Sequence, residues 1–276
     1  IDVISLTLGE PDFDVPKNIK DAAFQAINEN YSHYSPVPGF LELRQAVANK
    51  LKRDNNLVYK PNQICVSSGA KQSIFNVLAS IINDADEVIL PAPFWVSYEE
   101  MVKMVDGKPV AVETSIDTDF KITAEQLEKA ITPKTKALLY SSPCNPSGSF
   151  YTYEELKAIA EVIAKYPQIT IISDEIYEFI NYSGKHTSIA EFPEVYEQTA
   201  IINGMSKAFA MTGWRIGYSA CPDWLATACE KIQGQVTSGA NTVAQRASIT
   251  ALETDPSEYQ YMIKEFEKRR NSVYDL

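Results

Sequence analysis

A chain of 276 residues with 45% hydrophobic side chains is long enough to bury a substantial core, which predicts a globular protein. The net charge of -11 and the scattered Lys and Arg residues argue against nucleic-acid binding, because phosphate backbones are bound by clustered basic side chains. No apolar run approaches the roughly 18 residues of a membrane span and no signal peptide opens the chain, so we expect a cytoplasmic protein.

Cysteine and histidine residues do not predict a metal site. The four cysteines lack CxxC spacing, and two histidines are too few for an ordinary zinc cluster. We expect reduced, partly buried thiols and no bound metal. The residues concerned are Cys65, Cys144, Cys221, Cys229, His33 and His186.

Helical and strand patterns alternate along the chain after an N-terminal segment at residues 1–16. Apolar residues at helical spacing predict helices, and short apolar runs predict strands. The predicted helices are 18–28, 40–53, 71–82, 95–105, 124–131, 154–166, 223–235, 241–253 and 257–276. The predicted strands are 64–68, 87–91, 109–113, 136–142, 170–173, 199–203 and 213–220.

This alternation predicts an α/β fold, with a mostly parallel sheet between layers of helices. We expect residues 17–255 to form one large domain and residues 256–276 to begin a helix that leads out of it. The chain opens without methionine and closes inside a charged helical pattern, which predicts a part of a longer protein. Ligands of such sheets gather beyond the carboxyl ends of the strands.

Four side chains at the ends of predicted strands match three parts of pyridoxal phosphate. Lys207 can form a Schiff base with the aldehyde, and Ser206 and Arg215 suit the phosphate. Asp174 ends a strand and suits the protonated pyridine nitrogen. Because all four residues fall at the same predicted sheet edge, the sequence predicts a cofactor site there.

The glycine turn in VSSGAKQ (66–72) supplies a further phosphate element. Gly69 joins a strand to a helix, so the amides of Ala70 and Lys71 open a helix N-terminus that suits an anion. Trp95 lies at another predicted helix start, from which its indole could cover one face of the pyridine ring.

These motifs, with SDEIYEF (173–179), SSPCNPSG (141–148) and GMSKAFAMTGWRIGY (204–218), resemble the fold-type I aminotransferases, in particular the bacterial-type aspartate aminotransferases. The resemblance covers nearly the whole chain. It implies that Lys207 forms the Schiff base and then moves a proton from the substrate, and that Asp174 holds the pyridine nitrogen protonated. It also implies that Tyr177 and Asn145 contact the phenolic oxygen, with a cis peptide bond before Pro146.

The same resemblance implies a homodimer with a shared active site, because Tyr34 would reach the phosphate of the neighbouring subunit's cofactor. Gly9, in LGEPDFDVP (8–16), would lie against the substrate carboxylate, beside Trp95 and Asn145. Lys71 would bind a distal carboxylate, so the expected substrates are amino acids and 2-oxo acids, with aspartate as the favoured donor.

Two alternatives remain open at the level of sequence. The same cofactor site serves carbon–sulfur lyases, and the same fold occurs as a non-enzymatic sensor domain behind a DNA-binding module. Members of the family also carry a small C-terminal domain whose arginine binds the substrate α-carboxylate, and we expect that domain to be absent from this chain. The basic residues of the last predicted helix, Lys268, Arg269 and Arg270, are not expected to replace that arginine.

Overall fold

The computed structural model describes residues 9–182 and 184–276. In this part of the chain, one seven-stranded sheet has the order β1-β7-β6-β5-β4-β2-β3. All seven strands lie where the sequence places an apolar run. Their bounds are β1 (Ile64–Ser67), β2 (Glu87–Ala92), β3 (Lys108–Glu113), β4 (Thr135–Ser141), β5 (Thr170–Asp174), β6 (Thr199–Gly204) and β7 (Gly217–Ala220).

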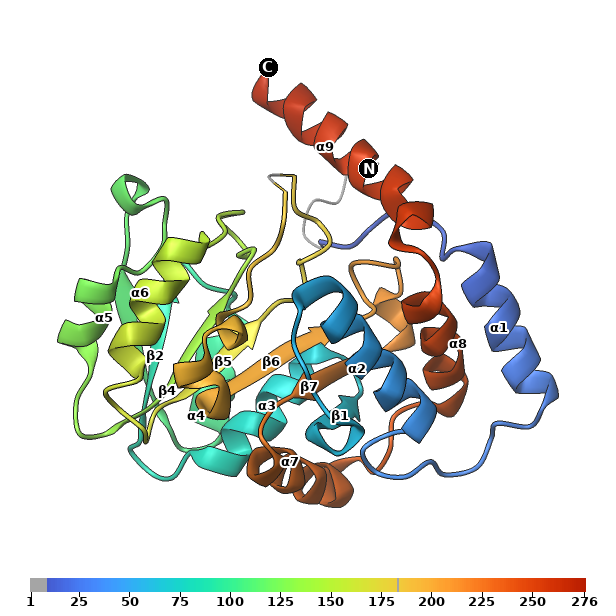
Figure 1. Ribbon diagram of the computed structural model, residues 1–276, viewed down its shortest axis with the longest axis horizontal. Coiled ribbons are helices and arrows are strands. Elements are labelled where there is room, and N and C mark those ends of the chain that lie inside the picture. The colour runs from blue at the N-terminus through green and yellow to red at the C-terminus, as the bar shows by residue number, and fades with distance from the viewer. Residues whose placement is uncertain (1–8, 183) are drawn as a thin grey trace, which may run out of the picture.

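The sheet is parallel except at β7 (Figure 1). Strands β3, β2, β4, β5 and β6 pair in parallel, whereas β7 pairs antiparallel with both β6 and β1. Parallel neighbours need a crossover connection, which the intervening helices supply. The predicted α/β fold with a mostly parallel sheet is therefore confirmed.

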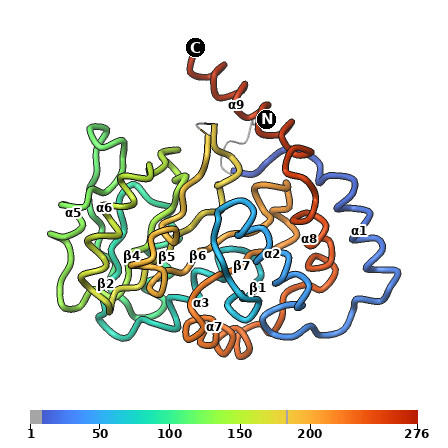
Figure 2. Tube along the Cα trace, in the orientation of Figure 1, coloured from blue at the N-terminus to red at the C-terminus, as the bar shows by residue number. Residues whose placement is uncertain are grey.

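Helices cover both faces of the sheet, as Figures 1 and 2 show. Side chains of β4 alternate between the two faces: Ala137 and Leu139 join the core under α3, α4 and α7, while Leu138 and Tyr140 join the core under α5 and α6. The helices are α1 (Lys17–Asn28), α2 (Leu41–Asn55), α3 (Ala70–Ile81), α4 (Ser97–Met104), α5 (Ala124–Ala130), α6 (Tyr153–Ile163), α7 (Asp223–Val236), α8 (Thr242–Glu253) and α9 (Gln260–Tyr274).

The start of β7 corrects the sequence prediction. The predicted strand began at residue 213, but residues 212–214 form a short 3-10 turn and Arg215 has a left-handed φ of 58°. A left-handed residue cannot continue an extended strand, so β7 begins only at Gly217. The shortened strand leaves Arg215 in a turn at the edge of the sheet where β6 ends.

Helix α9 extends away from the body of the molecule (Figure 2). Of its residues, only Met262 is buried. A short 3-10 turn, Pro256–Tyr259, separates it from α8. The domain boundaries proposed from the sequence stay predictions. In the described residues, no helix is both long and apolar enough to cross a membrane.

Candidate active site

A cavity of about 630 Å³ lies beyond the carboxyl ends of β4, β5 and β6. Every predicted site residue except Tyr34 lines it. The predicted residues in its wall are Gly9, Ala70, Lys71, Trp95, Asn145, Asp174, Tyr177, Ser206, Lys207 and Arg215. Residues that are up to 206 positions apart in the chain therefore face one space.

Tyr34 lies outside this cavity, and 95% of its surface is exposed. Its predicted role depends on the cofactor of a neighbouring subunit. That role stays a prediction, and within one chain Tyr34 does not belong to the site.

Lys207 lies in the turn after β6, where its amine faces the cavity. Its Nζ donates a hydrogen bond to the Gly9 carbonyl oxygen at 2.6 Å and lies 5.6 Å from the centre of the Tyr177 ring. Burial lowers the pKa of Lys207, Glu10 acts in the opposite direction, and Arg215 adds to the lowering. A lowered pKa makes the neutral, nucleophilic amine more available.

Asp174 ends β5 and is 4% exposed. Its Oδ2 accepts a hydrogen bond from the Tyr98 hydroxyl at 2.6 Å, and its Oδ1 accepts one from the Ile176 amide at 3.2 Å. No ion pair joins it to a lysine, arginine or histidine of the described residues. Burial therefore raises the pKa of Asp174 to about 6, although the Tyr98 hydrogen bond acts against this rise.

Tyr177 and Asn145 meet above the same edge of the sheet. Burial raises the pKa of the Tyr177 phenol, followed by the charge of Asp174, while a hydrogen bond with Asn145 acts in the opposite direction. The peptide bond before Pro146 is cis, as predicted. The amide and the phenol thus lie together and can both reach one ligand atom, while their contact with the phenolic oxygen stays a prediction.

The phosphate elements converge at the start of α3. Gly69 precedes this helix with φ 88° and ψ 157°, and as the N-cap residue it has no side chain to bond the first helical amides. A Cβ at position 69 would lie 2.2 Å from Arg215 Nη2. Arg215 is held by the Thr212 carbonyl oxygen at 2.8 Å. Helix amides and a guanidinium therefore line one corner of the cavity, which suits an anion.

Lys71 and Trp95 form a second corner. Lys71 Nζ lies 4.7 Å from the centre of the Trp95 ring, which places the cation over the indole. Trp95 lies two residues before α4, slightly outside the helix in which the sequence placed it. An indole and an ammonium group on the cavity wall can contact a ring and a carboxylate, respectively.

Six cavity residues were not predicted from the sequence: Glu10, Val96, Tyr98, Ser141, Ile176 and Thr212. Tyr98 lies three positions after Trp95, a spacing that puts both on one side of a helical segment, and this signal could have found it. Thr212 donates a hydrogen bond to Glu10 at 2.8 Å, although 202 positions separate them in the chain. No local pattern indicates that contact.

The sequence profile of the family described as aminotransferase class I and II matches residues 1–276. The chain belongs to this family. The aspartate/prephenate aminotransferase of Nitrosomonas europaea is 48% identical over 269 residues, covering 97% of the chain and 68% of the relative. The bifunctional aspartate aminotransferase and glutamate/aspartate-prephenate aminotransferase of Petunia hybrida is 46% identical over 275 residues, covering 98% of the chain and 57% of the relative.

Solved aminotransferase structures share the fold. The aspartate aminotransferase of Thermus thermophilus with maleate has a TM-score of 0.96 and 39% identity, covering 100% of this chain and 72% of that one. The chain thus spans between about half and three quarters of the length of these relatives.

Pyridoxal phosphate is the cofactor of these aminotransferases, and the residues of this chain fit it. The buried Asp174 faces the cavity, and no cation among the described residues pairs with it, so a protonated ring nitrogen would supply the missing partner. The corner at Gly69 and Arg215 has the donors for a phosphate, and it would be blocked by a side chain at position 69. The two groups match opposite ends of one cofactor.

Proposed function

We propose that this chain carries the cofactor site of an aminotransferase that moves an amino group from an L-amino acid to a 2-oxo acid. The observation that carries the proposal is that the Lys207 amine faces one cavity with the buried Asp174 carboxylate, which forms no ion pair within the described part of the chain. A basic amine and an acid without a counter-ion are costly to bury, and binding of the cofactor gives each of them a function. When bound, pyridoxal phosphate supplies an electron sink for the carbanion at the substrate Cα.

The position of each residue in the cavity indicates the part of the cofactor or substrate that it would contact. Arg215, Ser206 and the amides at the start of α3 would hold the phosphate, and Asp174 would hold a proton on the ring nitrogen. Tyr177 and Asn145 would contact the phenolic oxygen. Lys207, with its lowered pKa, would accept the proton from the substrate Cα and pass it on.

Aspartate is the donor that we propose. Lys71 places an ammonium group beside Trp95 on the cavity wall, where it can bind a second carboxylate. The Thermus thermophilus relative, 39% identical, is described with maleate, which is a dicarboxylate. Relatives named aspartate aminotransferase and aspartate/prephenate aminotransferase support the same substrate class and do not favour a lyase or a sensor domain.

A homodimer and a cytoplasmic location are part of the proposal. Tyr34 is exposed and free to contact a second subunit, which supports a shared site. Sedimentation at several protein concentrations would measure the oligomeric state, and a monomer throughout would contradict the dimer.

An absorbance titration tests the function. The protein loaded with pyridoxal phosphate is titrated with aspartate and then with 2-oxoglutarate, and we expect the cofactor band to be lost and then to return. A Lys71→Met variant should lower kcat/KM for aspartate by about 10- to 100-fold, because a charge-assisted hydrogen bond of about 1.5–3 kcal/mol is removed. The same variant should leave kcat/KM for alanine nearly unchanged. An equal loss for both amino acids would contradict the role of Lys71, and a band that ignores every amino acid would contradict the function.

A further inference from the structure

The segment Ser173–Glu178 has two faces with different chemistry. Asp174 and Tyr177 line the cavity, whereas Glu175 and Glu178 are buried away from it, with exposures of 1% and 8%. Buried carboxylates are rare unless they are paired. Two of them directly adjacent to two cavity residues therefore need an explanation.

Glu175 is bonded on both of its oxygens. Its Oε1 accepts hydrogen bonds from Ser188 at 2.6 Å and from Ser173 at 3.0 Å, and its Oε2 lies 3.0 Å from His186 Nε2. The backbone amide of Glu175 also donates to the Ile202 carbonyl oxygen of β6 at 2.8 Å. Hydrogen bonds from the segment 186–188 and to strand β6 thus hold Glu175, the residue that follows Asp174, in place.

Glu178 is bonded to α2. It forms an ion pair with Lys50, and its Oε2 accepts a hydrogen bond from Asn55 at 3.1 Å. Lys50 also donates to Asn55 at 2.8 Å, and the Lys50 side chain is completely buried. The residue that follows Tyr177 is therefore fixed to a helix that lies outside the cavity wall.

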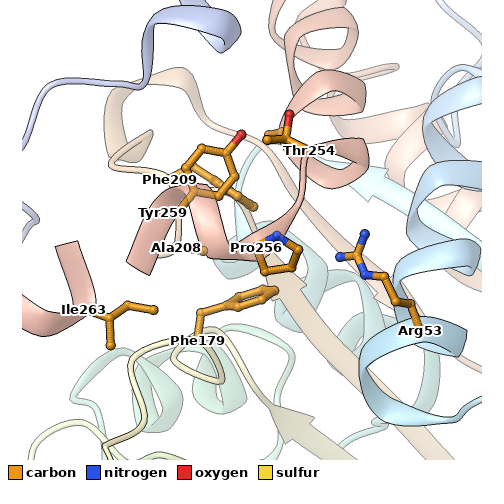
Figure 3. Close-up of a pocket in the computed structure, with 9 residues that line it drawn as sticks. Arg53, Phe179, Ala208, Phe209, Thr254, Pro256, Tyr259 and Ile263 are labelled. Atoms are coloured by element: carbon orange, nitrogen blue, oxygen red, sulfur yellow. The ribbon is translucent and has the colours of Figure 1, made fainter. Parts of the chain in front are cut away.

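Phe179 continues this anchoring. Lys50 Nζ lies 5.1 Å from the centre of its ring, and the Phe209 ring centre lies 6.0 Å away. Phe179 and Phe209 line a small pocket together with Pro256 and Tyr259 (Figure 3). Because Phe209 is two positions after Lys207, this packing connects the segment that carries Asp174 with the turn that carries Lys207.

A metal ion is the other occupant that this buried cluster could suggest. Ligand atoms of Glu175, Glu178 and His186 lie within 4.8 Å of one another. However, the Lys50 ammonium already bonds to Glu178, and Ser188 already bonds to Glu175. The side chains present therefore satisfy these carboxylates without a metal ion.

We propose that Glu175 is a positioning residue for the cofactor site, with Glu178 as a second anchor: together they hold the turn that presents Asp174 and Tyr177 to the cavity. The inference rests on the proposed function. Glu175 would act only through Asp174, since its own carboxylate does not reach the cavity. A structural role alone would stabilise the fold without a dependence of cofactor binding on residue 174. The charge of Glu175 raises the pKa of Asp174, so the loss of that charge alone would favour the ionised Asp174 and would not weaken binding.

A double-mutant cycle tests this coupling. The dissociation constant of pyridoxal phosphate is measured by titration of the cofactor-free protein, in the wild type, in Glu175→Gln, in Asp174→Asn and in the double variant. We expect Glu175→Gln to weaken binding about tenfold when residue 174 is Asp, and less than about twofold when it is Asn. Equal weakening in both backgrounds, or no weakening in either, would overturn the inference.

Two further variants keep the test decisive. Ser188→Ala removes the 2.6 Å hydrogen bond to Glu175 and the longer 3.4 Å bond that the Ser188 hydroxyl accepts from the Ala190 amide. It serves if Glu175→Gln does not fold, and it should weaken binding a few-fold only when residue 174 is Asp. Glu87→Gln is the matched control: Glu87 is also buried and is bonded to Lys108 and Thr132, but at the amino end of β2. It should leave the dissociation constant unchanged in both backgrounds, and an equal effect of the control would overturn the inference.

A wild-type protein that does not bind pyridoxal phosphate would overturn the proposed function itself.

Discussion

Asp174 and Glu178 are buried carboxylates four positions apart, and their pKa values are shifted in opposite directions. Burial raises the pKa of Asp174 to about 6, and no described cation offsets it. Burial also acts to raise the pKa of Glu178, but the charges of Lys50 and His186 and the hydrogen bonds from Lys50 and Asn55 outweigh it, so that its pKa lies below its usual value. The cluster around Glu178 is complete within the chain, whereas the cavity at Asp174 is complete only with a cationic partner.

Both carboxylates are buried, so burial does not distinguish the structural acid, Glu178, from the functional acid, Asp174. The presence or absence of a cationic partner does. Burial of an isolated charge costs several kcal/mol. A buried carboxylate that lacks a cation in the folded chain is therefore expected where a ligand supplies the cation. Substitutions in the cavity should therefore reduce ligand binding and turnover more than stability. Substitutions in the buried cluster should also reduce stability.

Lys207→Ala should give the largest effect on the cavity side. We expect turnover to fall by at least about 10⁴-fold, because both the nucleophile and the base are lost, while the melting temperature of the cofactor-free protein changes little. Mass spectrometry after borohydride reduction should find the cofactor attached to the wild type and not to the variant. Attachment in the variant at wild-type level would contradict the role of Lys207.

Asp174→Asn sharpens the comparison, because we expect it to weaken function and to strengthen the fold. The folded pKa of about 6 exceeds the usual 3.8, so the folded state binds more protons than the unfolded state between about pH 4 and 6. Wild-type stability should therefore fall as the pH rises through this window, by about 3 kcal/mol in total. Asn can still accept the hydrogen bond from Tyr98.

Urea unfolding of the cofactor-free proteins measures this effect. Asp174→Asn should be more stable than the wild type at pH 8, by up to about 3 kcal/mol, and the difference should vanish near pH 4. A difference that does not depend on pH would mean that the carboxylate is not the cause. The affinity for pyridoxal phosphate should fall in the same variant.

Gly69→Ala probes the phosphate corner with a single methyl group. The backbone at φ 88° and ψ 157° is a conformation that essentially only glycine adopts, and the new Cβ would displace the Arg215 guanidinium. We expect a loss of about 1–3 kcal/mol in the free energy of unfolding and about tenfold weaker cofactor binding. Gly148→Ala, also at positive φ but with open space around its Cβ, is the control and should cost stability without affecting binding.

Tyr34→Phe should give the smallest effect, because it removes one hydrogen bond at most. We expect the affinity for pyridoxal phosphate to fall by about two- to tenfold in a dimer, and not at all in a monomer. Equilibrium titration at protein concentrations above and below the dissociation of the dimer separates the two cases. An unchanged affinity in the dimer would remove Tyr34 from the site.

Most of the fold could be predicted because local patterns and tertiary contacts agree. The strand run at 170–173 and the helix pattern at 154–166 each match an element of the structure to within three residues. The convergence of the site could also be anticipated, since polar residues after parallel strands meet at one sheet edge. Lys207, Asp174 and Asn145 do line one cavity there.

The remainder depends on contacts that a local pattern does not encode. The strand predicted from residue 213 fails because Arg215 turns into the left-handed region, where its side chain lies against Gly69, 146 positions earlier. The buried position of Lys50 likewise depends on its ion pair with Glu178. From sequence alone, a lysine within a helix is ordinarily predicted to lie on the surface. The sequence indicates neither partner.

The hydrogen bond from Lys207 to Gly9 has a consequence for mutational scanning. Its acceptor is a backbone carbonyl, which every amino acid carries, so no substitution at position 9 deletes it. A scan of single substitutions would therefore assign little importance to this contact, however strongly it orients the lysine. Only a change that displaces the main chain, such as an insertion or an ester in place of the peptide group, can reveal what the contact contributes.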